Sequence, residues 1–341
     1  KISSGVISKP KKQTFVEKVM LYIRGNYFIP DARKNWVKPS VKFLSNYIKE
    51  HQIDTIITTG PPHSLHLIGL QLKEKLNLKW LADFRDPWTT IGYHKALKLT
   101  HSSKTKHNAL EINVLNTADD IIVTSHHTKN EFQTKTNQPI TVITNGYDTH
   151  SIRVEGKDAL FTLSHIGSLL ADRNPIILWE TLSELIRENE VFSKVFQLNL
   201  VGLVSDTVLE SIYNNGLKNH LNNVGYVSHD EALKFQMQSQ LLLLIEIDSE
   251  DTKAIIPGKI FEYLVAETPI LAIGPKDAEV EQIIKNTNTG TYFNYREKSK
   301  LKAQILNYFE AFQSNDLKVN AIGLKPYSRK ALTEKLSLLI K

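Results

Sequence analysis

The stretch "IPGKIFEYLVAETPILAIG" (256–274) joins the pattern of a short helix to the pattern of a buried strand. Gly258 permits a tight approach, "KIFEYLVAE" has apolar residues at helical spacing, and "PILAIG" is a run of small and branched apolar residues. Such runs are typical of parallel strands covered on both faces. Lys259 and Glu262 lie three positions apart on the polar side of the helix, where an exposed ion pair is the simplest interpretation.

The composition predicts a globular chain without disulfides. Its 341 residues are 41% hydrophobic, which is enough for two domains of ordinary size. No cysteine is present, which excludes thiol catalysis and thiolate metal sites and fits a reducing compartment. The beginning of the chain lacks the apolar centre of a signal peptide, so we expect a cytoplasmic protein. The net charge of +6 favours anionic partners such as phosphates, acidic lipid or nucleic acid.

Strand-like and helix-like runs alternate along the chain, which predicts an α/β fold with two doubly wound, Rossmann-like domains. We expect a first domain over residues 1–150, a second over 151–325, and a C-terminal helix over 326–341 that crosses back to the first domain. The polar stretch 146–159 is the predicted linker. The expected strands are 54–60, 79–84, 119–125 and 140–146 in the first domain, and 160–167, 196–202, 221–227, 240–246 and 269–274 in the second.

Several motifs occur in the order and spacing of one enzyme family. They include "LSHIGSL" (163–169), and the most specific of them are "TGPPHS" (59–64), "ADFRDPW" (82–88) and "KIFEYL" (259–264). From about residue 27 to the end, the chain resembles the family 4 glycosyltransferases of GT-B type, and in particular the bacterial enzymes that build capsular polysaccharide and lipopolysaccharide. Relatives normally begin with a strand and a glycine-rich loop that have no counterpart here, so we expect the first βα unit to be missing.

The resemblance implies a hexosyltransferase that moves a sugar from a nucleoside-diphosphate sugar to a glycan or lipid-linked acceptor, with retention and without a metal ion. The donor would lie in a cleft faced by both domains. Lys259 would then face the phosphates, while Glu262 would accept hydrogen bonds from the ribose. One helical turn would therefore recognise two parts of a nucleoside diphosphate.

The loop "HIGSLLADRNP" (165–175) lies where the family has its other phosphate-binding loop. Gly167 permits close approach to an anion, and Arg173 can donate to two phosphate oxygens. Ser168 replaces a cation that relatives commonly have, and Glu267 replaces a common glycine. A second glutamate that relatives often carry would fall at Ala254. A plain turn and a solvated arginine are the structural alternatives for this loop.

On the first domain, Arg85 and Asp86 follow a strand, at the edge of the sheet where ligands gather. By the resemblance, Asp86 would orient or deprotonate the acceptor hydroxyl, and Arg85 would bind a charged acceptor or fix Asp86. The alternative is a structural salt bridge. His63 and Ser64, expected to be exposed beside two prolines, are acceptor-side candidates of second rank.

The basic stretch 93–111 has leucines and histidines interleaved with its cations. It is either a peripheral contact with the inner face of an anionic membrane or an ordinary exposed basic helix.

Other functions have less support. No dinucleotide or P-loop motif occurs, and we expect neither a cofactor nor a bound metal ion. A GT-B nucleotide-sugar epimerase is the first alternative, because it would use the same fold without an acceptor. A basic nucleic-acid-binding protein is the second, supported only by the charge; we expect no nucleic-acid partner.

Overall fold

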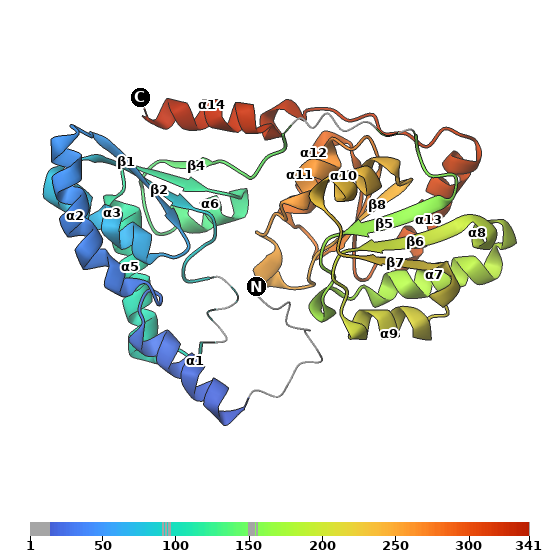
Figure 1. Cartoon of the computed structure of the whole chain (residues 1–341), viewed down its shortest axis with the longest axis horizontal. Helices are drawn as coiled ribbons and strands as arrows, with labels where there is room; N and C mark the ends of the chain where they lie inside the picture. Colours follow the sequence, from blue (N-terminus) through green and yellow to red (C-terminus); the bar gives the residue numbers. More distant parts are fainter. Residues whose placement is uncertain are drawn as a thin grey trace. The chain divides into compact units, whose positions relative to one another are not determined.

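The structure is a computed structural model that describes residues 14–90, 92, 94, 97–148, 154 and 156–340. The chain divides into two compact units, one formed by residues up to Asn145 together with the C-terminal helix, and one formed by Gly146–Arg329. We call them the N-terminal unit and the C-terminal unit (Figure 1).

The N-terminal unit contains a parallel sheet of four strands in the order β1-β2-β3-β4. The strands are β1 (Thr55–Gly60), β2 (Lys79–Phe84), β3 (Asp120–Val123) and β4 (Ile140–Val142). The helices are α1 (Phe15–Tyr27), α2 (Val37–Glu50), α3 (Ser64–Leu76), α5 (His101–Thr117), α6 (His126–Gln133) and α14 (Arg329–Ile340). Ser125 caps α6 by accepting a hydrogen bond from the backbone N–H of Thr128.

The C-terminal unit contains a parallel sheet of six strands in the order β10-β9-β8-β5-β6-β7. The strands are β5 (Phe161–Ile166), β6 (Phe196–Val201), β7 (Leu221–Gly225), β8 (Leu241–Ile245), β9 (Ile270–Gly274) and β10 (Gly290–Asn294). The helices are α7 (Ile176–Glu188), α8 (Glu190–Val195), α9 (Asp206–Asn214), α10 (His229–Gln238), α11 (Lys259–Leu264), α12 (Glu279–Thr287) and α13 (Lys298–Gln313). Because the strand order reverses between β5 and β8, this is a doubly wound sheet with its switch point between those two strands.

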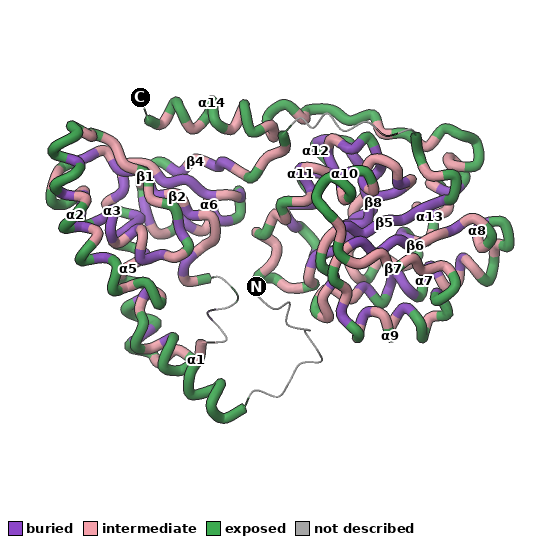
Figure 2. The backbone as a smooth tube through the Cα atoms, viewed as in Figure 1, coloured by how far each residue is buried: buried purple, intermediate pink, exposed green. Residues whose placement is uncertain are grey.

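Burial on both faces explains the apolar strands of the second sheet. Along β8, Leu241 and Leu243 belong to one hydrophobic cluster and Leu242 and Leu244 to another, on the opposite face. Figure 2 shows β5, β6 and β8 as buried runs. The predicted α/β class, with two parallel sheets and interleaved helices, is therefore confirmed.

The C-terminal helix α14 packs on the first sheet. Its leucines 332, 336 and 339 recur at helical spacing and contact a small cluster formed by Leu81, Ile122 and Ile143. The Lys335 ammonium also donates to the carbonyl oxygen of Val142 at 3.0 Å.

Some predicted boundaries are wrong for local reasons. The helix that we expected over 259–267 ends at Leu264, because Glu267 adopts φ +53° and Pro269 follows shortly after. A left-handed residue is unfavourable for a side chain, which explains why a glycine suits this position. The helical pattern of residues 175–190 is divided at Asn189, which ends α7 and caps α8.

Candidate functional site

The candidate site of the C-terminal unit lies at the switch point of its sheet. Gly167 follows β5, Glu246 follows β8, and Lys259 begins the helix α11 that comes after β8. Ligands of doubly wound sheets bind at the carboxyl ends of the strands at such a point, because adjacent loops diverge there. The sheet topology thus brings together residues that are far apart in the sequence.

Lys259 is half-buried and contacts an imidazole. Its Nζ lies 3.3 Å from Nε2 of His165, a residue of β5 that is 0% exposed. Burial and, to a smaller extent, the nearby charge of Arg173 lower the pKa of Lys259 to about 8, although Glu246 and Glu262 act in the opposite direction. A cation that is crowded by another cation and poorly hydrated is well suited to receive an anion.

Glu262 lies on the same turn but makes different contacts. Its Oε2 accepts a hydrogen bond from Nε2 of Gln236 at 2.8 Å, and its Oε1 is 3.9 Å from Nε2 of His229. No ion pair joins Glu262 to Lys259 among the described residues, so the interpretation as an exposed ion pair is wrong. Glu262 lines a hollow of about 170 Å³ together with Tyr147, Asp148, Leu233, Gln236, Met237, Val265 and Ala266.

Gly167 has a conformation that requires glycine. Its φ is +116°, and a Cβ placed on it would lie 2.9 Å from Nζ of Lys259. Its N–H donates to the carbonyl oxygen of Val201 at 2.7 Å, which fixes the turn against β6. Ser168, the next residue, is exposed at the same turn. The turn therefore leaves the lysine ammonium accessible at the end of β5.

Arg173 lies in a short 3-10 turn, Ala171–Arg173. Its Nε is buried and has no hydrogen-bond partner among the described residues. Buried guanidinium nitrogens normally have an acceptor, so this donor is available for a ligand oxygen. The interpretation of Arg173 as a solvated loop charge does not fit a buried Nε.

Glu246 is a site residue that the sequence analysis missed. Its side chain is 3% exposed, and burial raises its pKa to about 7, although Arg173 and Lys259 both oppose this shift. A glutamate directly after the five apolar residues of β8 was the available signal, because a charge at the carboxyl end of a buried parallel strand points to the ligand edge. His165 was also missed, although it lies within a quoted motif.

In the N-terminal unit, Arg85 and Asp86 follow β2 as predicted, but their contacts differ from the expectation. Nη1 of Arg85 is 3.8 Å from Oδ1 of Asp83, and its Nη2 donates to Asn145. The ion pair of Arg85 is therefore with Asp83 and not with Asp86. Burial raises the pKa of Asp86, and the charge of Arg85 opposes this shift.

His63 and Ser64 are buried, so the expectation that they are exposed is wrong. His63 is 1% exposed and stacks on Trp88 with 4.8 Å between ring centroids. Burial lowers the pKa of His63 to about 2, and neither ring nitrogen has a hydrogen-bond partner among the described residues. Ser64 donates through its N–H and its hydroxyl to Asp31, at 2.8 and 2.7 Å, so it anchors the start of α3. No local sequence pattern pointed to Asp31, because its contact with Ser64 joins segments that are 33 residues apart.

A hollow of about 460 Å³ lies beside His63 in the same unit. Its wall combines apolar side chains and three prolines with charged and imidazole groups: Leu21, Arg24, Phe28, Pro30, Asp31, Pro61, Pro62, His63, His94, Leu97 and His107. The basic segment 93–111 contributes to this wall and continues into α5; residues 93, 95 and 96 lie outside the described residues.

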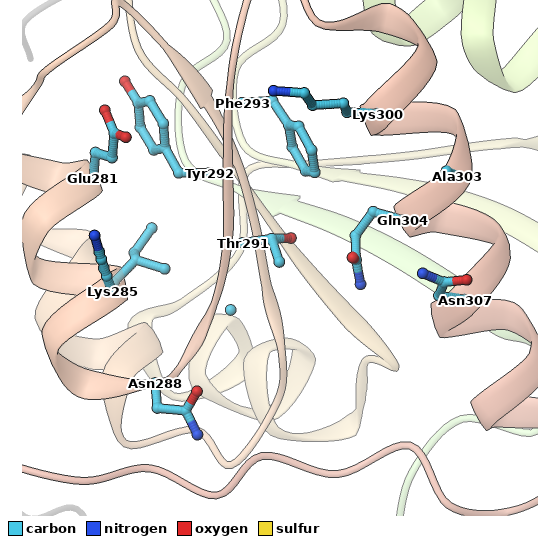
Figure 3. Close-up of a pocket in the computed structure, with 12 residues that line it drawn as sticks. Glu281, Lys285, Asn288, Thr291, Tyr292, Phe293, Lys300, Ala303, Gln304 and Asn307 are labelled. Carbon is cyan, nitrogen blue, oxygen red and sulfur yellow. The ribbon is translucent and has the colours of Figure 1, made fainter.

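A further hollow in the C-terminal unit is separate from these residues. It measures about 540 Å³ and lies along the edge strand β10, between α12 and α13. Figure 3 shows Thr291 in its centre, with Lys285 on one side and Gln304 on the other. None of the candidate residues lines it.

The described residues contain no group of three or more His, Asp or Glu side chains placed to bind a metal ion. They also contain no helix of the length and apolar character needed to cross a membrane.

Solved structures with similar folds define the class of protein. Sucrose-phosphate synthase from Thermosynechococcus elongatus superimposes with a TM-score of 0.59 at 13% identity, over 90% of this chain and 78% of that one. WaaG, a glycosyltransferase involved in lipopolysaccharide biosynthesis, gives a TM-score of 0.54 at 14% identity, over 88% and 81%. A TarM mutant from S. aureus, solved with Fondaparinux, alpha-GlcNAc-glycerol and UDP, gives 0.56 at 14% identity, over 88% of this chain and 59% of that one. The chain has the GT-B fold of glycosyltransferases.

The sequence assigns the family more closely. Residues 6–151 match the sequence model of Glycosyltransferase Family 4, the family that the motifs resemble. The resemblance stated from the motifs is thereby confirmed. The comparison with curated protein sequences gave no match.

Proposed function

We propose that this protein transfers a hexose from a nucleoside-diphosphate sugar to a glycan or lipid-linked acceptor. The observation that carries the proposal is the pair of cationic groups at the switch point. Among the described residues, the buried Nε of Arg173 has no acceptor, and Lys259 lies at hydrogen-bond distance from a neutral imidazole. The match to the family 4 model and the UDP bound to TarM support the same donor class.

The site chemistry follows from where charge develops. Glycosyl transfer places negative charge on the departing diphosphate, so cations held in a poorly hydrated site stabilise the transition state more than the ground state. Lys259 and Arg173 would supply this charge. Glu262, held by Gln236 through one oxygen, would accept from the ribose hydroxyls through the other.

On the N-terminal unit, Asp86 is the candidate that orients or deprotonates the acceptor hydroxyl. A carboxyl with a raised pKa is a stronger base, which suits this role. Arg85 is the candidate that binds a charged acceptor. His63 and Ser64 would act indirectly, by shaping the wall at the end of β1.

The finer parts of the proposal come from the family resemblance. They are retention of anomeric configuration, metal independence, a role in building capsular polysaccharide or lipopolysaccharide, and a cytoplasmic location with peripheral membrane contact through residues 93–111. An NMR spectrum of the new linkage tests retention: the same anomeric configuration as the donor is expected, and the opposite one would refute it.

A thermal-shift series with UDP, GDP, ADP and their hexose conjugates tests the donor class. A ligand at about one hundred times its dissociation constant stabilises the folded state by about 2.7 kcal/mol, which raises Tm by roughly 5 °C or more in a unit of this size. We expect one nucleoside diphosphate to give this shift. If none does, the proposal is wrong, and release of a free epimeric sugar would identify an epimerase instead.

A further inference from the structure

His165 occupies a position that normally belongs to the hydrophobic core. Strand periodicity places it in line with Phe161 and Leu163 on β5, and its side chain is 0% exposed. Burying an imidazole is unfavourable unless both ring nitrogens find partners. The partners of this imidazole therefore indicate what it does.

Two contacts of the ring nitrogens indicate the tautomer, and the backbone of Ser168 also interacts with the imidazole. Nδ1 lies 3.1 Å from the carbonyl oxygen of Leu243 on the neighbouring strand β8. A carbonyl oxygen only accepts, so Nδ1 must carry the hydrogen. Nε2 then presents a lone pair to Nζ of Lys259, 3.3 Å away, which donates to it.

The imidazole stays neutral beside the ammonium. Burial is the main cause that places the pKa of His165 well below its usual value, and the charge of Lys259 adds to it. The other charged groups near Lys259 are Arg173, Glu246 and Glu262. His165 is thus an uncharged hydrogen-bond acceptor for Lys259, whose other neighbours named here are charged.

The contact restricts where the ammonium lies. An ammonium has three donors, so the one bound by His165 leaves two for a ligand. Gly167 leaves room for the ammonium because it has no side chain, and a Cβ there would lie 2.9 Å from Nζ. The lysine is held at the end of β5 without being neutralised.

We propose that His165 is a positioning residue that holds the Lys259 ammonium, through Nε2, in the place where it meets the diphosphate of the donor. This inference rests on the proposed function for its ligand, but the contact itself can be tested without any ligand. His165 would act through Lys259 and would not touch the substrate.

Three variants separate positioning from packing. His165→Leu fills most of the volume but removes both hydrogen bonds, and His165→Gln places an amide oxygen near the position of Nε2. Ser164→Ala is the matched control, because Ser164 is equally buried on the same strand and bonds to Asn199 and Ser239, away from Lys259.

The first measurement is the rate at which acetic anhydride labels Lys259, read by mass spectrometry as a function of pH without ligand. The neutral amine is the reactive form, and loss of a hydrogen-bond acceptor destabilises the ammonium. His165→Leu should therefore lower the pKa of Lys259 and raise its labelling near neutral pH by roughly tenfold. His165→Gln and Ser164→Ala should keep the wild-type profile. An unchanged profile in His165→Leu would overturn the inference.

The second measurement needs no variant. ¹⁵N NMR of the imidazole in the wild-type protein should show a protonated Nδ1 and an unprotonated Nε2, and the opposite tautomer would refute the inference even if His165→Leu failed to fold. The third is calorimetry with UDP, in which His165→Leu should bind about tenfold more weakly and His165→Gln nearly as tightly as wild type. If neither wild type nor any variant binds UDP or another nucleoside diphosphate, the proposed function fails, while the labelling and NMR results still decide whether His165 positions Lys259.

Discussion

A methyl group added at Gly167 tests the close approach between β5 and Lys259. In Gly167→Ala the new Cβ would lie 2.9 Å from Nζ and 3.4 Å from Cε of Lys259, so the ammonium must shift by a few tenths of an ångström. We expect a shift of that size to disturb the 3.3 Å contact with His165, which is already long for a hydrogen bond. The φ of +116° adds strain of roughly 1–3 kcal/mol for a residue with a side chain.

We therefore expect two separable effects in Gly167→Ala. Strain should lower the free energy of unfolding, and displacement of the ammonium should weaken UDP binding by about five- to tenfold, the cost of one hydrogen bond. The control is Gly216→Ala, because Gly216 has φ +74° but nothing within 4 Å of its Cβ position. Urea denaturation and calorimetry measure the two effects. Wild-type UDP affinity in Gly167→Ala, or an equal loss in Gly216→Ala, would refute the reasoning.

Three further predictions concern other residues. Burial raises the pKa of Glu246 from 4.5 to about 7, so the folded protein keeps a proton that the unfolded chain releases. The free energy of unfolding should therefore fall as pH rises between these two values. In urea titrations at about pH 5 and about pH 7.5, Glu246→Gln should show a smaller fall. Asp31→Ala removes the acceptor of both Ser64 hydrogen bonds and should cost about 1–3 kcal/mol of stability while leaving UDP affinity unchanged; an altered affinity would contradict the placement of Asp31 outside the donor site. EDTA should leave the transfer rate unchanged, because Lys259 and Arg173 take the place of a metal ion, and recovery of a lost rate by magnesium or manganese would show that they do not.

The strands could be predicted from the sequence because burial on both faces leaves a clear pattern. β8 and β9 are continuous apolar runs, and the structure places them at or within one residue of the expected limits. The edge strand β10 was not predicted, because "GTYFN" is only partly buried and begins with glycine. Residue patterns report burial, and an edge strand has less of it.

The candidate site was predictable only in part, since its contacts cross long stretches of sequence. The helical turn of Lys259 and Glu262 could be singled out by motif, but not the imidazole that contacts Lys259 from a different strand. His63 was expected to be exposed because it follows two prolines in a loop, yet it stacks on Trp88. Local sequence does not show which segment covers a loop.

Binding of a nucleoside diphosphate by α11 can be measured by calorimetry of Glu262→Ala. The ligand is UDP, or whichever diphosphate gives the thermal shift. Loss of the carboxylate hydrogen bonds to the ribose should weaken binding by roughly 1.5–3 kcal/mol, which is about 10- to 150-fold. Glu190→Ala, which breaks an exposed pair with Lys194, is the control and should bind as wild type. We expect the large loss of diphosphate affinity in folded Glu262→Ala alone. An unchanged affinity in that variant would mean that Glu262 of α11 does not bind the nucleotide.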